Sequence, residues 1–225
     1  MSNSCDKKVT CSHCGKESDF TIWSTINTED NPHLKQAVRD RSAFLFTCPA
    51  CGEVMEVDYG CLYHEVESKL MIYYVQDAQT FTMAENLFRG QTVPGQLVLP
   101  DSTDYLYRIV VSQNQLVEKL AIFDAGWDDR IIECLKIIYA SRIRSQKPEL
   151  KADDVFFCTD SEGINRLMFT SGNKCVATVA LNGIVYQTAC EQIGTGLPEV
   201  RQDDIVIDSA GALRRIQSVG LFRKN

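Results

Sequence analysis

The sequence lacks any long apolar run. Residues 1–8, Met-Ser-Asn-Ser-Cys-Asp-Lys-Lys, contain nothing like the hydrophobic part of a secretory signal. No later segment reaches the run of about eighteen apolar residues that spans a bilayer. We therefore expect a cytoplasmic protein with no membrane association.

A surplus of basic residues is also missing. The 225 residues include 23 Lys and Arg against 30 Asp and Glu, which gives a net charge of −7 and a pI near 5.0. Binding to nucleic acid requires cationic side chains that neutralise phosphates. Nucleic-acid binding is therefore only a lesser alternative for this chain.

Motifs for nucleotide binding and nucleophilic catalysis are absent too. Gly194-Thr-Gly196 is a lone pair of glycines with neither a following lysine nor a strand–helix context. No Ser/His/Asp pattern is evident in the sequence. The sequence gives no support for nucleotide use, and an enzymatic role is the less favoured reading.

Cysteine, in contrast, is abundant, with ten residues. In a reducing compartment they are better interpreted as metal ligands and small buried residues than as disulfides. Cys11 and Cys14 are separated by two residues and followed by glycine, and Cys48 and Cys51 repeat this pattern. Such a turn presents two sulfurs to one ion, and glycine permits the positive φ that the turn needs. We predict that these four cysteines bind one metal ion.

Zinc is the metal that we favour, as one structural ion in a ribbon of two knuckles. Four thiolates close the coordination shell and leave no position for a reacting water, which argues against metal catalysis. The same pattern, with Pro49 after Cys48, also occurs where rubredoxins hold iron for electron transfer. Tetrahedral sulfur does not distinguish the two metals, so iron stays as the minor alternative.

The other cysteines and the histidine in the first knuckle receive simpler interpretations. His13 is expected to be exposed and not a ligand, and His33 to lie on the surface of a helix. Four cysteines lie in or beside apolar stretches and are expected to be small buried residues: Cys134, Cys158, Cys175 and Cys190.

Hydrophobic periodicity and turn residues predict an α+β fold. It comprises a zinc-ribbon-like antiparallel β portion, a helical hairpin and a C-terminal β-meander with helices. Strands are expected over residues 20–26, 42–47, 53–58, 69–75, 105–111, 155–159, 166–170 and 175–180. Helices are expected over residues 30–39, 112–124, 128–142 and 208–216. Residues 184–193 fit a strand or a helix, and helix is favoured because Ala189, Glu191 and Gln192 are helix formers.

Three further segments complete this prediction. Residues 1–10 are polar and are expected to be irregular. Residues 76–103 contain several breakers and are expected to form a loop with a short helix near residues 82–88. We expect a zinc-binding domain over residues 1–146, which includes the helical hairpin, and an α+β region over residues 147–225. The alternative is that the two regions pack together as one body.

The second knuckle carries a resemblance to a known family. The segments Phe46-Thr-Cys-Pro-Ala-Cys-Gly52, Leu62-Tyr-His-Glu65 and Lys69-Leu-Met-Ile-Tyr-Tyr74 are similar to the CpXC domain, a bacterial and archaeal family named for its two cysteine pairs. The similarity extends over roughly residues 9–140. The first pair here, Cys-Ser-His-Cys, departs from the CPxC form of the family without changing the ligands. The resemblance implies the fold and the metal site, and it implies no substrate.

Two functions follow as hypotheses. In the first, the knuckles fix hairpins whose surface binds a protein or a small molecule, and the identity of that partner is open. In the second, an enzyme or small-molecule site lies near Tyr63-His64-Glu65, with His64 and Glu65 as weak candidates for acid–base catalysis. On a strand these three residues alternate between faces, so His64 cannot share a face with both neighbours.

Overall fold

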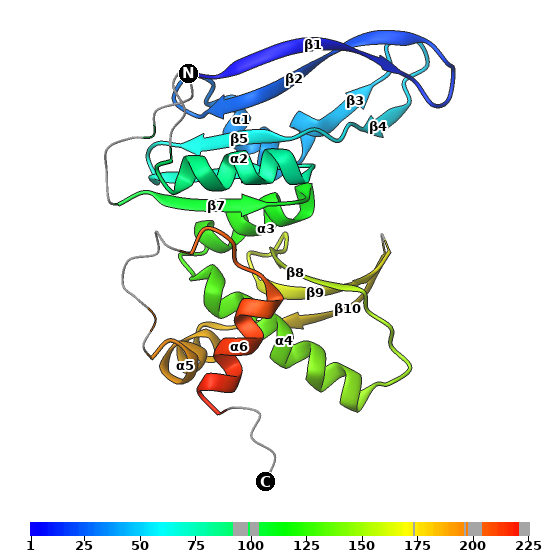
Figure 1. The fold of residues 1–225 in the computed structure, drawn as a ribbon. Helices are drawn as coiled ribbons and strands as arrows, with labels where there is room; N and C mark the ends of the chain where they lie inside the picture. The colour runs from blue at the N-terminus through cyan, green and yellow to red at the C-terminus, as the bar shows by residue number, and fades with distance from the viewer. Residues whose placement is uncertain (92–98, 100–103, 173, 196, 198–203, 221–225) are drawn as a thin grey trace. The chain divides into compact units, whose positions relative to one another are not determined.

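The computed structural model describes residues 1–91, 99, 104–172, 174–195, 197 and 204–220, shown in Figure 1. These residues form six α-helices and ten strands arranged in three sheets. The predicted α+β class is therefore confirmed. Residues 92–98 and 100–103 of the predicted loop lie outside the described part of the chain.

The chain divides into two compact units. The first comprises Met1–Val117 and Val200–Val206, and the second comprises Glu118–Glu199 and Ile207–Asn225. This division falls inside a helix, whereas the sequence analysis expected a domain boundary after residue 146. The expected boundary stays a prediction.

A five-stranded sheet, in the order β1-β2-β5-β6-β7, forms the centre of the first unit (Figure 1). Strand β2 pairs in parallel with β5, and β6 pairs in parallel with β7, whereas the other neighbours are antiparallel. The five strands are β1 (Asn3–Thr10), β2 (Glu17–Asn27), β5 (Cys61–Glu65), β6 (Leu70–Tyr74) and β7 (Leu106–Val110).

Each face of this sheet has its own helix. Helix α2 (Ala78–Phe88) packs its buried residues on Met71, Tyr107 and Ile109. Helix α1 (His33–Arg39) bonds to residues of β5 whose side chains alternate with those facing α2. Because successive strand residues point to opposite faces, α1 and α2 cover opposite faces of the sheet.

Strand β1 corrects one prediction. The polar residues 1–10 were expected to be irregular, but Asn3–Thr10 form an eight-residue strand that pairs with β2. Nearly all of its side chains are exposed. Backbone hydrogen bonds to β2 hold this strand in place. Its side chains have no apolar pattern that could do so.

A separate two-stranded hairpin carries the second knuckle. The predicted strand 42–47 begins as a single turn of 3₁₀-helix, η1 (Ser42–Phe44), before β3 (Leu45–Thr47), which pairs with β4 (Val54–Glu56). Arg41 adopts the left-handed conformation with φ of 66° just before this turn. The predicted antiparallel hairpin is confirmed, with shorter strands.

The second unit contains four helices and a meander. The meander has the strand order β10-β9-β8. The three strands predicted for this region therefore pair in chain order, as expected for a meander. Its elements are α3 (Gln113–Asp124), shared with the first unit, α4 (Asp129–Gln146), β8 (Asp154–Thr159), β9 (Asn165–Ser171), β10 (Lys174–Ala180), α5 (Gly183–Ile193) and α6 (Ser209–Ser218). Thirteen buried residues, from these elements and from Leu181 just after β10, form one cluster.

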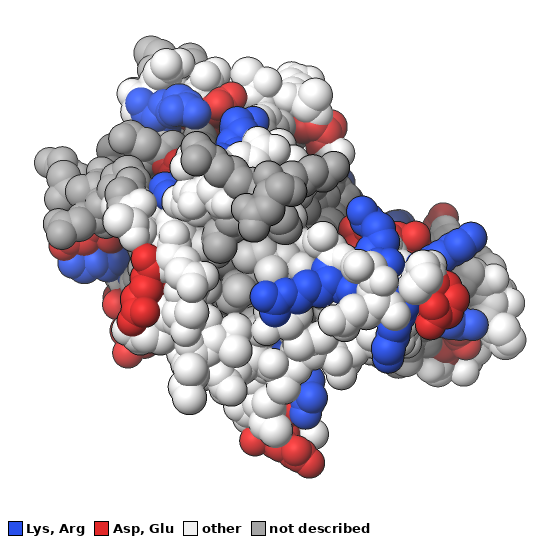
Figure 2. Space-filling model, turned by 90° about the horizontal axis from the view of Figure 1, so that it is seen from below, with Lys and Arg blue, Asp and Glu red and all other residues white. Residues whose placement is uncertain are grey.

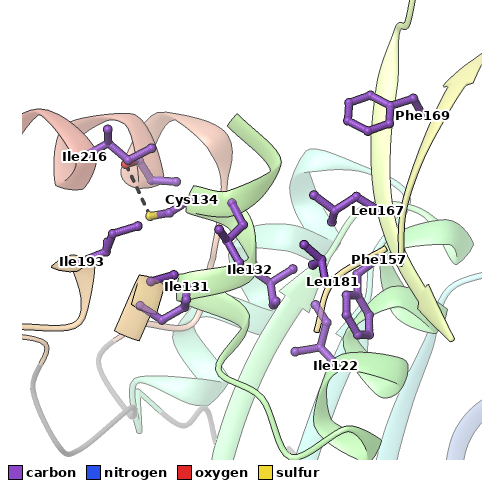
Figure 3. Packing of buried hydrophobic residues seen from close by; sticks show 13 residues of the cluster. Ile122, Ile131, Ile132, Cys134, Phe157, Leu167, Phe169, Leu181, Ile193 and Ile216 are labelled. Atoms are coloured by element: carbon purple, nitrogen blue, oxygen red, sulfur yellow. Dashed lines mark hydrogen bonds between the residues drawn. The ribbon is translucent and has the colours of Figure 1, made fainter. Parts of the chain in front are cut away.

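Figure 3 shows this core from close by. Ile132 and Ile122 point toward Phe157, Leu167 and Leu181 of the meander region. On the other side of α4, the thiol of Cys134 bonds to the carbonyl of Ala212 at 3.7 Å. The expectation of a small buried residue is therefore confirmed for Cys134, whereas Cys158 and Cys190 are half-buried and Cys175 is exposed, which corrects that expectation.

Local capping signals place several helix ends where the sequence predicts them. The hydroxyl of Ser112 accepts the N–H of Gln115 at 3.2 Å, as expected for a capping box. Gly126, with φ of 71°, follows the end of α3, and Asp208 accepts the N–H of Gly211 at the start of α6. Among the described residues, the helices are too short or too polar to cross a membrane.

Candidate metal centre

The first knuckle connects β1 to β2. The N–H of Cys11 donates to the carbonyl of Lys16 at 2.9 Å, and the N–H of Gly15 donates to the carbonyl of Cys11 at 2.9 Å. Gly15 has φ of 73°, where other residues are strained. These bonds fold the segment back sharply, so that Cys11 and Cys14 lie on the same turn.

The second knuckle connects β3 to β4 with the same turn. The N–H of Cys48 donates to the carbonyl of Glu53 at 2.8 Å, and the N–H of Gly52 donates to the carbonyl of Cys48 at 2.9 Å. Gly52 has φ of 77°. The positive φ predicted for both glycines is confirmed, and it is the reason that the CxxCG spacing recurs.

The fold brings the four cysteines together. The sulfurs of Cys11 and Cys51 are 3.6 Å apart, those of Cys14 and Cys48 are 3.7 Å apart, and all four lie within 4.8 Å of one another. A tetrahedron of sulfurs about 2.3 Å from a central ion has edges of about 3.8 Å. The cluster therefore has the size that a tetrathiolate metal site requires, and could hold a metal ion.

The two positions of each knuckle differ in exposure. The first cysteines, Cys11 and Cys48, are each 1% exposed, whereas the second ones, Cys14 and Cys51, are exposed. His13, between the first pair, is exposed and lies outside the cluster, as predicted. One side of the cluster thus faces the apolar interior of the ribbon and the other faces solvent.

Backbone groups and neighbouring thiols change the acidity of the cluster. The N–H of Ala50 lowers the pKa of Cys48 to about 7. The N–H of Glu53 lowers the pKa of Cys51. Loss of hydration and the neighbouring thiols outweigh this effect and raise the pKa to about 12. Thiols this close together do not all ionise readily at neutral pH, so a divalent ion is what would hold all four as thiolates.

The apolar support beneath the cluster is small. Its buried residues are Cys11, Phe46 and Cys48. Phe46 contacts the ring of Phe20 edge-on at 6.0 Å, which links the β3–β4 hairpin to β2. Two of the three buried residues of this cluster are therefore cysteines of the candidate site.

The alternative site near Tyr63-His64-Glu65 divides between two faces of β5. The hydroxyl of Tyr63 donates to Glu65 at 2.6 Å, while a ring nitrogen of His64 lies 3.1 Å from the hydroxyl of Tyr105. His64 is half-buried. Burial lowers the pKa of His64, which favours its neutral form. The three neighbours thus do not form one group, and the two weak candidates for acid–base catalysis, His64 and Glu65, have different partners.

Glu65 is 2% exposed and has a complete set of partners. One carboxylate oxygen accepts Lys35 Nζ at 2.9 Å and Ser68 Oγ at 2.7 Å, and the other accepts Tyr63 Oη and Arg39 Nη2 at 3.0 Å. Burial alone would raise the pKa of Glu65, but these donors and the charge of Arg39 lower it to about 2. The side chain therefore fastens α1 to the sheet.

Sequence reasoning did not find the partners of Glu65. Lys35 and Arg39 are four residues apart and therefore lie on one face of α1. Tyr63 and Glu65 are two apart and share a face of β5. Both spacings were visible in the sequence, but nothing in it indicated that these two faces meet.

Comparison with known proteins adds one finding. The family model described as CpXC protein matches residues 9–136, which is more than half of the chain and includes all four cysteines of the cluster. No curated protein and no solved structure gives a significant match.

Proposed function

The chain belongs to the CpXC family, and from this premise and the four-cysteine cluster we propose that it is a zinc-binding protein whose single ion is structural. The ion would be held by Cys11, Cys14, Cys48 and Cys51. Its role would be to order a surface of the ribbon that binds a protein or a small molecule. We place this protein in the cytoplasm, where thiols stay reduced.

The observation that carries this proposal is the poverty of the apolar core beneath the knuckles. The β3–β4 hairpin has three residues in each strand, and isolated hairpins of this kind are marginal in water. The cluster beneath it fully buries one large apolar side chain, Phe46, in addition to two cysteines, and its other apolar members are only partly buried: Val9, Phe20, Met55 and Val57. A structural zinc ion contributes on the order of 10 kcal/mol, far more than one buried phenylalanine at roughly 2 kcal/mol.

The chemistry of the ligand set supports a structural role. Four protein sulfurs complete a tetrahedral shell, so the ion would offer no open position to water or substrate. What the ion supplies when bound is charge neutralisation and a rigid link between the two knuckles. The residues of the chain provide the turns, the buried ligands and the aromatic support.

The choice of zinc over iron rests on the setting of the site. An iron site for electron transfer usually forms the centre of a much smaller domain. Metal analysis of natively purified protein tests this choice directly. Colourless protein with about one equivalent of zinc is expected, and red protein with stoichiometric iron would contradict it.

The proposed partner is a protein or a small molecule. On the described part of the face in Figure 2, basic side chains lie among acidic and uncharged ones without a broad basic area. This distribution and the net charge of −7 disfavour nucleic acid. A mobility shift that weakens steeply with salt would contradict this part of the proposal.

Removal of the ion tests the structural role. A strong chelator should release the metal and expose the backbone amides of both knuckles to hydrogen exchange. Mass spectrometry of the natively purified protein, in the same experiment, identifies any molecule that remains bound. If the metal is removed and exchange in the ribbon is unchanged, the structural role is wrong.

A further inference from the structure

The outer edge of β4 presents unused backbone groups. Two bonds bracket the hairpin, from the N–H of Cys48 to the carbonyl of Glu53 and from the N–H of Val57 to the carbonyl of Phe44. In an antiparallel pair, hydrogen-bonded residue pairs alternate with pairs that point their backbone groups away from each other. Both end residues of β4 fall on the second kind of pair. Their N–H and C=O groups therefore point away from β3.

These two residues are Val54 and Glu56. Within the described ranges, β4 has β3 as its one strand neighbour. The backbone of Val54 and Glu56 has no hydrogen-bond partner among the described residues. This short edge therefore offers two donors and two acceptors in the arrangement that a further strand requires.

The outer face of the same hairpin exposes aliphatic side chains. Leu45 is 40% exposed and Val54 is 54% exposed. Phe46 and Met55, which alternate with them, face the small cluster beneath the metal site. The outer face of the hairpin thus combines two partly exposed aliphatic side chains with Thr47 and Glu56.

The charge along this edge has one sign. Glu53, Glu56 and Asp58 are all exposed, and Asp58 also accepts hydrogen bonds from Tyr74 and Gln113. One ion pair involves this row in the described structure: Arg41 lies 3.8 Å from Glu56, and both side chains are exposed. Four thiolates around a divalent ion would add about two negative charges a few residues away.

We propose that the outer edge of β4 binds an extended segment of a partner protein as an added strand, and that this segment alternates basic with aliphatic residues. The backbone groups of Val54 and Glu56 would pair with the segment. Val54, with Leu45 on the same face, would face the aliphatic side chains of the segment, and Glu53 on the opposite face would contact its basic ones. Glu56 and Asp58 would add negative charge along the edge. This inference rests on the proposed function, because the hairpin must be ordered by the metal before it can pair.

The other three sheet edges of the first unit differ from this one. On the outer edge of β3, the N–H of Leu45 is already used, because it donates to the carbonyl of Ser42. The edge of β7 is used, because the N–H of Ile109 donates to the carbonyl of Ile205 at 2.7 Å. The edge of β1 carries Lys7 and Lys8, and charged lysines on an edge discourage pairing. The edge of β4 combines free backbone, exposed aliphatic side chains and acidic charge.

Synthetic peptides test this proposal on the full-length, metal-loaded protein. The probe is a short fluorescent peptide that alternates lysine and valine, and fluorescence anisotropy measures its binding. One control alternates glutamate and valine, and another is the lysine peptide with N-methylated amides on its pairing edge. Binding of the first probe alone is expected. Equal binding of either control, or no binding of the probe, would overturn the proposal.

Hydrogen exchange locates the binding. The amides of Val54 and Glu56 should become protected when the peptide binds, while that of Met55, which points toward β3, should not change. The double variant E53K/E56K should lose about tenfold in affinity, or about 1.4 kcal/mol. E162K/E191K makes the same charge change at two exposed acids of the second unit and should bind as the wild type does.

Metal analysis of each variant separates this inference from the proposed function. If the protein holds metal and has an ordered ribbon but does not bind the peptide, the inference is overturned and the proposed structural role of the ion is unaffected. Protein that never holds metal overturns the proposed function. Self-association through β4, or protection of these amides by nucleic acid in place of the peptide, also overturns the inference.

Discussion

The ribbon of β1 to β4, which carries the four-cysteine cluster, and the core of the second unit differ in how many apolar side chains they bury. Beneath the knuckles, three residues are buried, and two of them are Cys11 and Cys48. In the second unit, thirteen buried residues form one apolar cluster (Figure 3). The ribbon has two three-residue strands in its smaller hairpin, whereas the meander has strands of six and seven residues.

This difference shows how burial and ligation substitute for each other. Apolar burial contributes roughly 25 cal/mol per Å² and needs many side chains to stabilise a fold. A metal ion replaces that area with four bonds at one point. The ribbon is therefore expected to depend on its ion, and the second unit on the volume of its side chains.

The largest expected effect is that of metal removal. Chelation should remove a contribution on the order of 10 kcal/mol from the ribbon, because its core cannot compensate. Hydrogen exchange should rise in peptides that cover β1 to β4 and stay constant in peptides that cover β8 to β10. An equal rise of hydrogen exchange in both regions would contradict the prediction that only the ribbon depends on the ion.

Truncation in the apolar core should have the next largest effect. Ile132 is 0% exposed, so Ile132→Ala should cost about 2–5 kcal/mol in the free energy of unfolding by leaving a cavity. Metal content should remain that of the wild type. Ile184 is 77% exposed on α5, and Ile184→Ala should change stability by less than about 0.5 kcal/mol. Loss of metal in Ile132→Ala would contradict the separation of the two regions.

Glu65 tests a third kind of support, a buried ionic group in the first unit. Glu65→Gln removes the charge that Arg39 and Lys35 face and should cost about 3 kcal/mol. The pKa of Glu65 is lowered from 4.5 to about 2 in the folded protein. Its stabilising contribution is therefore complete above the unfolded value and is lost as the pH falls through the folded value.

The pH dependence follows from this sign. The difference in stability between the wild type and Glu65→Gln should be largest near neutral pH and should shrink between about pH 4.5 and pH 2. Denaturant unfolding of both proteins at several pH values measures it. Acid release of a bound metal affects both proteins alike and cancels in the difference. A constant difference over this range would show that the charge of Glu65 is not the stabilising feature.

The smallest expected effect is at the knuckle glycine. A Cβ on Gly52 meets nothing within 4 Å, so the cost of Gly52→Ala comes from its φ of 77° and should be about 1–2 kcal/mol. The affinity for the metal should fall by the factor that corresponds to this free energy, and a competition titration measures it. Gly183→Ala adds the same methyl group in open space at a helical position without positive φ, and it should not destabilise the protein.

Local signals in the sequence were sufficient for much of the fold. The CxxCG spacing specifies two turns, since both glycines lie within five residues of the first cysteine of their pair. The box of Ser112 and Gln115 and the cap at Asp208 place helix starts in the same way. The cap at Asp77 was available too, and it explains why α2 begins at Ala78, before the predicted position near residue 82.

What the sequence alone determined was therefore short-range: turn chemistry, caps, alternation within strands and the identity of the four candidate ligands. The tertiary structure decided which distant segments meet. Backbone pairing accepts almost any side chain, so the polar strand β1 and the parallel pairing of β2 with β5 left no mark in the sequence. The partners of Glu65 and the free edge of β4 were decided at the same level, because each depends on how separate elements pack and not on the residues of either one.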